Sequence, residues 1–167
     1  MRQLVREEQP GDSQQIRKLN EAAFGRSDEA DLIDGLRQGG VVLLSLVAEV
    51  DSQIIGHILF SRMTVETAQG PMAAVSLAPM AVLPDHQRRQ VGSLLVRRGL
   101  AELRERGERI VIVLGHKEYY PRFGFTSEKA RHLVSPFPPE AYMALELVQG
   151  ALAGVEGSVR YAAAFGL

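Results

Sequence analysis

The 167-residue sequence contains no cysteine, which excludes a disulfide framework, a thiol nucleophile and a thiolate metal site. Its histidines are scattered and show none of the spacing typical of metal ligands. They are His57, His86, His116 and His132. We therefore predict that the protein holds no structural metal.

The sequence also has no large excess of positive or negative charge. The sequence has 19 lysines and arginines against 20 aspartates and glutamates, for a formal net charge of -1. Such a chain has no general basic field for nucleic acid, so its arginines must be interpreted locally. We predict no nucleic-acid partner.

Long apolar runs are absent as well. The N-terminal segment passes from Leu4 and Val5 into charged residues, and no later segment approaches the length of a membrane span. We expect a cytoplasmic protein without a membrane partner. Its length suits one domain with a substantial core, predicted to cover residues 1–167.

Strand and helix patterns alternate along the chain, which indicates an α/β (α+β) fold. A helix is expected after Gly11-Asp12-Ser13, and Asp51-Ser52 indicates a hairpin turn. The predicted strands cover residues 4–7, 41–50, 54–61, 73–83 and 109–114, and the later helices cover 29–36 and 91–106. A late pair of strands is predicted at 141–148 and 158–164, joined by a glycine-rich connection.

The most informative stretch runs from Met80 to Ser93, where an apolar strand leads through an arginine-rich turn into an amphipathic helix. Free N–H groups at a helix N-terminus, at the positive end of its dipole, favour anions such as pyrophosphate. Gly92 allows close backbone approach, and Arg88 and Arg89 add guanidinium groups suited to phosphate oxygens. The alternative is an ordinary connection with solvated arginines.

The order of these elements, with Gln87-Arg88-Arg89-Gln90-Val91-Gly92 in the turn and Tyr119-Tyr120-Pro121-Arg122-Phe123-Gly124-Phe125 after the next strand, resembles the GNAT superfamily of N-acetyltransferases. It is most similar to an uncharacterised bacterial subfamily with a Gly-His-Ile strand and a Val-Leu-Gly turn. The resemblance implies a mixed sheet of about seven strands, splayed at the cofactor site, with about four helices.

The resemblance also implies acetyl-CoA as co-substrate. In the family's phosphate loop, Gln87 takes the first place, Gly92 the last, and Gln90 the place of a glycine, for which we expect a negative φ. A proline in the strand, Pro79, indicates a bulge or an edge. The residues assigned to the cofactor are Met80, Ala81, Val82, Gln87, Arg88, Arg89, Gln90, Val91, Gly92, Ser93 and Tyr120.

The resemblance implies a chemical role for two groups. The N–H groups of Ala81 and Val82 are candidates to hold the thioester carbonyl, whose oxygen gains negative charge when an amine attacks. Tyr120, four residues before Gly124, takes the place of the family's general acid for the departing thiolate. Tyr119 is expected to point elsewhere on a helical turn, and packing on the sheet is the alternative for both rings.

The sequence leaves several candidates for the general base. His116, just after a strand end, is the catalytic candidate, beside Glu118, Glu49, His57 or a chain of waters. An alkylammonium must lose a proton before it attacks, because it is almost wholly charged at neutral pH. For His57 an interior structural role is favoured.

The acceptor pocket is expected between the first two helices and the last strand pair. Asp28, Glu29 and Asp31 would attract a cationic amine there. Alternatively, Ser27 caps the second helix and the acids complement its dipole. The acceptor, a small-molecule or peptide amine, has no further identity in the sequence, and the family also allows a homodimer through the C-terminal strands.

These features favour acetyl transfer from acetyl-CoA to a primary amine by direct attack, because the chain lacks cysteine and shows no Ser-His-acid signature. The alternative, from a different functional class, is a non-catalytic acyl-CoA-binding sensor or interaction module. A dinucleotide or ATP binder is disfavoured, because there is no Gly-x-Gly-x-x-Gly after the first strand and no Gly-Lys-Ser or Gly-Lys-Thr loop.

Overall fold

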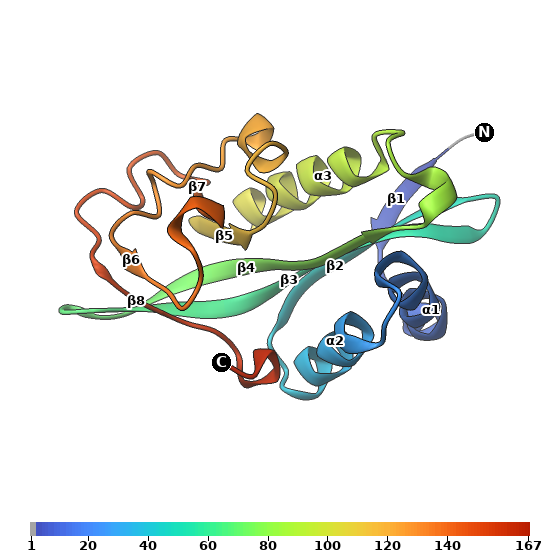
Figure 1. Cartoon of the computed structure of the whole chain (residues 1–167), viewed down its shortest axis with the longest axis horizontal. Helices are drawn as coiled ribbons and strands as arrows, with labels where there is room; N and C mark the ends of the chain where they lie inside the picture. The colour runs from blue at the N-terminus through green and yellow to red at the C-terminus, as the bar shows by residue number, and fades with distance from the viewer. Residues whose placement is uncertain (1–2) are drawn as a thin grey trace.

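The computed structural model describes residues 3–167 and consists of one mixed sheet with helices on both faces (Figure 1). The sheet has eight strands, in the order β1-β2-β3-β4-β5-β7, with β8 paired to β3 and β6 paired to β8. The strands are β1 (Leu4–Glu7), β2 (Val42–Val50), β3 (Gln53–Thr67), β4 (Gly70–Val82), β5 (Ile110–Leu114), β6 (Leu133–Val134), β7 (Tyr142–Glu146) and β8 (Gly157–Arg160).

Three α-helices are present in the described residues: α1 (Ser13–Phe24), α2 (Asp28–Gln38) and α3 (Val91–Glu105). Helices α1 and α2 cover one face of the sheet, called here the α1/α2 face, and α3 covers the opposite α3 face (Figure 1). Short 3-10 turns are η1 (Pro10–Asp12), η2 (Pro84–His86), η3 (Tyr120–Phe123), η4 (Pro139–Ala141) and η5 (Ala163–Phe165). The α+β class with a mixed central sheet is therefore confirmed.

The central strands form the predicted hairpins. Asp51 and Ser52, between β2 and β3, both have positive φ (49° and 68°), as a two-residue hairpin turn requires. Strand β3 extends beyond the predicted residues 54–61. Its first part pairs with β2 and its last part, Thr64–Thr67, pairs with β8.

Strands β4 and β5 separate soon after they meet. Their parallel pairing is confined to Val75 with Val111 and Ser76 with Ile112. Beyond that point, β4 also carries a register shift toward β3, where Ala78 and Pro79 lie opposite Leu59. The bulge predicted from Pro79 is confirmed, and so is the splay of the sheet. One edge of β4 therefore runs without a strand partner into the turn before α3.

The structure differs from the expected fold in three details. Three α-helices are present in residues 3–167 where about four were expected, and the segment after β5 forms the short 3-10 turn η3. The two late strands do not pair with each other, because β7 satisfies its backbone groups on β5 while β8 pairs with β3 and β6. The strand count is eight because the two-residue β6 joins β8 by parallel pairing.

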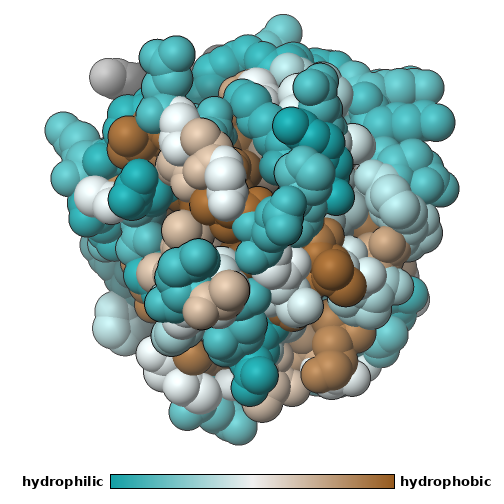
Figure 2. Space-filling view, turned by 90° about the vertical axis from the view of Figure 1, so that its left-hand side faces the viewer, coloured by the Kyte–Doolittle hydropathy of each residue, from teal (hydrophilic) through white to brown (hydrophobic). Residues whose placement is uncertain are grey.

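Figure 2 shows the end of the molecule that carries β6, β8 and the turn between β3 and β4, where small hydrophobic areas are separated by hydrophilic ones. Val134 of β6 is 68% exposed. Within residues 3–167, none of the helices has the length and apolar character needed to cross a membrane.

Helix α3 packs closely on the sheet. Its predicted apolar face is confirmed, since Val96, Leu100 and Leu103 are buried. A Cβ atom on Gly99 would lie 2.4 Å from Cε2 of Phe60, a fully buried ring of β3. The helix therefore needs glycine here to reach the depth that places its N-terminus beside β4.

We predict that Gly99→Ala lowers the free energy of unfolding by about 1–3 kcal/mol, despite alanine's better helix propensity, because the added methyl overpacks the core. Denaturant unfolding measures the change. In a Phe60→Leu background the same substitution should cost less, since the ring atoms that it meets are gone. Equal costs in both backgrounds would contradict the contact.

Candidate active site

A cavity of about 810 Å³ lies where the open edge of β4 meets the turn into α3 and the segment after β5. Its lining residues come from these three segments. They are Met80, Val82, His86, Gln87, Arg88, Gln90, Val91, Gly92, Ser93, His116, Glu118, Tyr119 and Arg122. Of the residues predicted to contact the cofactor, all but Ala81, Arg89 and Tyr120 lie in this lining.

The turn before α3 is shaped by two residues in the left-handed region. Arg88 has a φ of 62° and Gln90, the N-cap of α3, a φ of 69°. The expectation of a negative φ for Gln90 is therefore wrong. Left-handed residues within a turn direct successive N–H groups into one concavity, an arrangement that binds anions. The geometry compensates for the missing glycine at the cost of backbone strain in Gln90.

Backbone N–H groups alternate in direction along β4. The Leu83 N–H donates to the carbonyl oxygen of Ile55 at 2.8 Å, so the N–H of Ala81, two residues earlier, also points toward β3. The N–H groups of Met80 and Val82 then point away from β3, to the open edge. Ala81 itself is buried on the α1/α2 face.

The side chain of Gln87 supports this arrangement. Its amide nitrogen donates to the carbonyl oxygen of Val82 at 3.0 Å. A carbonyl that accepts from a side chain at this point lies at the open edge, not in the ladder with β3. Gln87 therefore ties the turn to the end of β4.

Tyr119 was expected to point elsewhere, and that expectation is wrong. Its hydroxyl lies 3.1 Å from the Ser93 hydroxyl, in the first turn of α3. A Cβ on Gly92 would lie 3.2 Å from the same hydroxyl. Helical periodicity failed here because the chain forms a 3-10 turn. Tyr119 thus reaches across the cavity from the β5 side to the α3 side.

Tyr120 lies beneath Tyr119, at the start of η3. It is 6% exposed, and its ring packs against the end of β5, where a Cβ on Gly115 would come within 2.7 Å of it. Burial, together with the neighbouring Tyr119, raises the pKa of the Tyr120 phenol. The phenol therefore keeps its proton at neutral pH. Its assignment as general acid stays a prediction.

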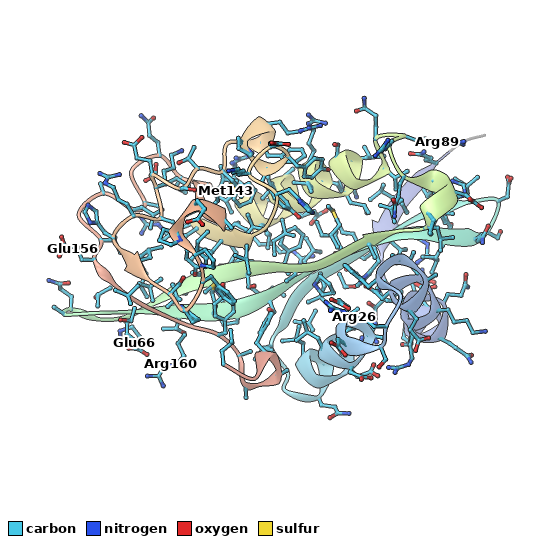
Figure 3. All side chains as sticks on the ribbon, viewed as in Figure 1. Arg26, Glu66, Arg89, Met143, Glu156 and Arg160 are labelled. Carbon is cyan, nitrogen blue, oxygen red and sulfur yellow. The ribbon has the colours of Figure 1, made fainter. Side chains whose placement is uncertain are left out.

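Two arginines line the cavity. Arg88 and Arg122 line it with two histidines, and the Arg122 guanidinium stacks over the Tyr119 ring at 4.5 Å. Arg89 is exposed and lies at the α3 end of the molecule (Figure 3). Sequence reasoning missed Arg122, although its position three residues after Tyr119 on a tight turn is a signal for the contact. Among residues 3–167, no cluster of His, Asp and Glu is placed to hold a metal ion.

The candidate bases lie in different places. His116 and Glu118 are exposed residues of the cavity lining. Glu49 is occupied by an ion pair with Arg6 at 3.2 Å. His57 is fully buried on the α1/α2 face, so the structure separates it from the cavity lining.

A second cavity, of about 410 Å³, lies between α2 and η5. Its lining residues are Asp28, Glu29, Asp31, Leu32, Ala164 and Phe165. The acids are paired, since Arg26 binds Glu29 at 2.6 Å and Arg17 binds Asp31 at 2.7 Å. These guanidinium groups lower the pKa of both carboxyls. Arg26 lies on the opposite side of the sheet from Arg89 (Figure 3).

Ser27 occupies the N-cap position of α2, but its side chain caps no backbone N–H. The expectation that its hydroxyl caps this helix is therefore wrong. Three acidic residues in the first turn, each ion-paired with an arginine, supply the favourable charge at this N-terminus instead.

Comparison with known proteins gives a consistent result. Residues 4–127 match the model of the acetyltransferase (GNAT) domain family. The uncharacterized N-acetyltransferase YjhQ of Escherichia coli strain K12 is 39% identical over 142 residues, covering 83% of this chain and 78% of that protein. YhbS, another uncharacterized N-acetyltransferase of the same strain, is 35% identical over 95% of each chain.

Two solved structures are similar over nearly the whole chain. The crystal structure of YhbS from Escherichia coli in complex with CoA has a TM-score of 0.93 and 34% identity, covering 100% of this chain and 93% of that chain. A GNAT family acetyltransferase from Brucella melitensis in complex with acetyl-CoA has a TM-score of 0.83 and 34% identity, with 98% of each chain covered.

The positive φ of Gln90 predicts an unusual order of stabilities. Gln90→Gly should have a free energy of unfolding about 1 kcal/mol higher than that of Gln90→Ala, because only glycine adopts this conformation without strain. Urea unfolding of the two variants measures the difference. An alanine variant as stable as the glycine variant would show that position 90 is not left-handed in solution.

Burial of His57 predicts a pH dependence of stability. Burial lowers the pKa of His57 to about 3, with a smaller contribution from Arg37. The unfolded state therefore binds the proton more readily, and stability present above pH 6.5 is lost as the pH falls toward 3. Between pH 7 and pH 5, protonation of this group in the unfolded state should by itself lower the free energy of unfolding by about 2 kcal/mol.

Chemical unfolding at pH 7 and pH 5 tests that expectation. His57→Leu should lose less stability than the wild type over this interval, whereas the substitution of the exposed His132 by leucine should leave the interval unchanged. An identical pH response in the wild type and His57→Leu would contradict the burial of a neutral imidazole.

Proposed function

This chain belongs to the GNAT acetyltransferase family, and on that premise we propose that the cavity between β4, α3 and η3 binds acetyl-CoA for transfer of its acetyl group to a primary amine. The observation that carries the proposal is the shared location of three features. An unpaired strand edge, an anion-binding turn and a tyrosine pair all line or adjoin one cavity.

The turn and the open edge suit different parts of the co-substrate. The concave turn at Arg88–Gln90 and the N-terminus of α3 favour the pyrophosphate, through N–H groups and the helix dipole. The free edge of β4 offers backbone groups to the amides of the pantetheine arm, as an added strand would do. CoA and acetyl-CoA occupy the structures of two close relatives, which supports this assignment.

The reaction is a direct transfer. The neutral amine nitrogen attacks the thioester carbonyl carbon, a C–N bond forms, and the carbonyl oxygen becomes an oxyanion. Because the N–H groups of Met80 and Val82 point to the open edge, we assign them to this oxyanion in place of Ala81. The C–S bond then breaks, which leaves the amide and the thiolate of CoA.

Tyr120 is proposed to protonate that thiolate. Its ring lies at the end of β5, next to the point where the sheet opens, and its raised pKa keeps the phenol protonated. Tyr119, whose hydroxyl lies between Ser93 and Gly92, is proposed to contact the bound co-substrate instead. In this proposal Tyr119 contributes to binding and Tyr120 donates the proton.

The acceptor is proposed to approach from the α1/α2 face. The cavity between α2 and η5 opens there, beside three carboxylates that favour a cationic group even though each is ion-paired with an arginine. The scaffold alone does not define the amine, because function depends on the site.

Calorimetric titration with acetyl-CoA, followed by a free-thiol assay against a panel of primary amines, tests the function. Binding with amine-dependent thiol release is the expected result. Binding without release against every amine would favour a sensor. Absence of binding would overturn the proposal.

The tyrosine pair gives a sharper prediction. Tyr120→Phe should lower kcat by about 10²-fold with little change in acetyl-CoA affinity, because only the proton donor is lost. Tyr119→Phe, the matched variant, should weaken acetyl-CoA binding about five-fold through a lost hydroxyl contact. Unchanged turnover in Tyr120→Phe would remove that residue from the mechanism, and a loss confined to Tyr119→Phe would transfer the role to its neighbour.

A further inference from the structure

Buried polar atoms without partners occur on the α1/α2 face of the sheet and on helix α1, which packs on that face. Three buried side-chain atoms in the described residues have no hydrogen-bond partner: Nδ1 of His57, Oγ of Ser61 and Oδ1 of Asn20. His57 and Ser61 are four residues apart on β3 and therefore share one face. Asn20 is a buried residue of α1, which packs on that face. A buried polar atom without a partner requires an explanation, such as an internal water or a role in catalysis.

The hydrogen bonds on the other side of His57 have a defined direction. The Ser45 hydroxyl donates its one hydrogen to Oε1 of Glu8, which is held by Arg37 at 2.8 Å. Ser45 can therefore only accept from His57, whose Nε2 lies 2.8 Å from its oxygen. The imidazole proton sits on Nε2, and the lone pair of Nδ1 points into the protein without a partner.

His57 does not line the co-substrate cavity, but it lies one strand away from the residues assigned to the oxyanion. It pairs across the ladder with Ala81, just past the bulge at Pro79, and Ala81 lies between the two residues assigned to the oxyanion. Ser61 pairs with Ser76, the last residue of β4 that still contacts β5. The unpartnered polar atoms of β3 thus lie beside the segment of β4 where the sheet opens.

Charges around His57 are few. Glu8, after β1, lies 3.8 Å from Nε2, and Arg37 of α2 lies beyond it. Neighbours in the ladder are Val47 on β2 and Ala81 on β4, and α1, which packs on this face, carries the neutral Asn20 and apolar residues. Among the contacts of residues 3–167, a proton that arrives at Nδ1 therefore has one anionic destination, the Glu8 carboxylate.

We propose that His57 is the general base, and that its Nδ1 takes the proton of the acceptor's ammonium while the chain Ser45–Glu8 removes a proton from the other side of the ring. This inference rests on the proposed transferase function. The ammonium N–H bond breaks and an Nδ1–H bond forms. The Nε2 proton passes to the Ser45 oxygen, and the Ser45 hydroxyl proton passes to Glu8. The imidazole ends neutral, the amine becomes nucleophilic, and the proton rests on a carboxyl group near the surface.

This route explains why a buried imidazole is retained in a layer of apolar side chains. A neutral ring can relay a proton without holding a charge in the interior, since one nitrogen gains a proton as the other loses one. His116 and Glu118 line the co-substrate cavity on the other side and have no such outlet among the described contacts. The alternative is a purely structural histidine that binds an internal water.

Steady-state thiol release by the full chain tests the proposal, with the fastest primary alkylamine of the panel and with hydroxylamine as acceptors. His57→Leu should fold, bind acetyl-CoA normally and lose about 10²-fold in kcat with the alkylamine. Its rate should then rise with pH as the free amine accumulates. Hydroxylamine is already neutral at neutral pH, so its transfer should fall much less. Ser45→Ala should behave in the same way, and His132→Asn should match the wild type.

The tautomer gives a readout that needs no acceptor. Nitrogen-15 NMR of the wild type with acetyl-CoA should show His57 neutral, with its proton on Nε2. A proton on Nδ1, or a His57→Leu variant that is folded and as fast as the wild type with the alkylamine, would overturn the proposal. Equal losses with both acceptors would show a structural role instead. If the wild type itself binds no acetyl-CoA, the proposed function fails rather than the assignment of His57.

Discussion

The separation of β4 from β5 is the constraint on which the rest of this structure depends. A strand in the middle of a sheet normally forms hydrogen bonds to a neighbouring strand along both edges. An open edge leaves N–H and C=O groups that need partners. Here the parallel pairing stops at Ser76, yet β4 continues to Val82. Gln87 satisfies one carbonyl at the end of this edge, and the remainder faces a cavity. The fold thus keeps a strand edge open at its centre, where we propose that the co-substrate binds.

The two faces of the sheet divide the chemistry. The turn at Arg88–Gln90, α3 and the tyrosine pair lie on the α3 face, and Arg88 and Arg122 line the same cavity. The relay from His57 to Glu8 lies on the other side, under α1 and α2. Strand β3 supports both, because its residues alternate between the α3 face and the α1/α2 face. An amine and a thioester that approach from opposite faces would meet at the bulge of β4.

Local sequence patterns were sufficient for the elements that build the gap. Pro79 predicted the bulge because proline lacks a ladder donor, and the periodicity of α3 predicted its buried face. The left-handed backbone conformation of Gln90 was not predictable in the same way, since it follows from how the turn closes between β4 and α3. Tyr119 was misplaced because the helical period does not apply to a 3-10 turn.

Contacts between segments that are distant in the sequence could not be predicted from local patterns either. The relay joins residue 8, residue 45 and residue 57 from three separate elements, and no local pattern links them. The pairing of β8 with β3 is equally remote in sequence, so the last strands were wrongly expected to pair with each other.

Residue-specific amide hydrogen exchange with and without acetyl-CoA tests the central claim most directly. The account predicts that acetyl-CoA protects the N–H groups of Met80 and Val82 and those at the start of α3, whereas the N–H of Ala81 is already protected by β3. Protection that spares the edge of β4, or an equal gain at Ala81, would contradict a co-substrate bound along that edge.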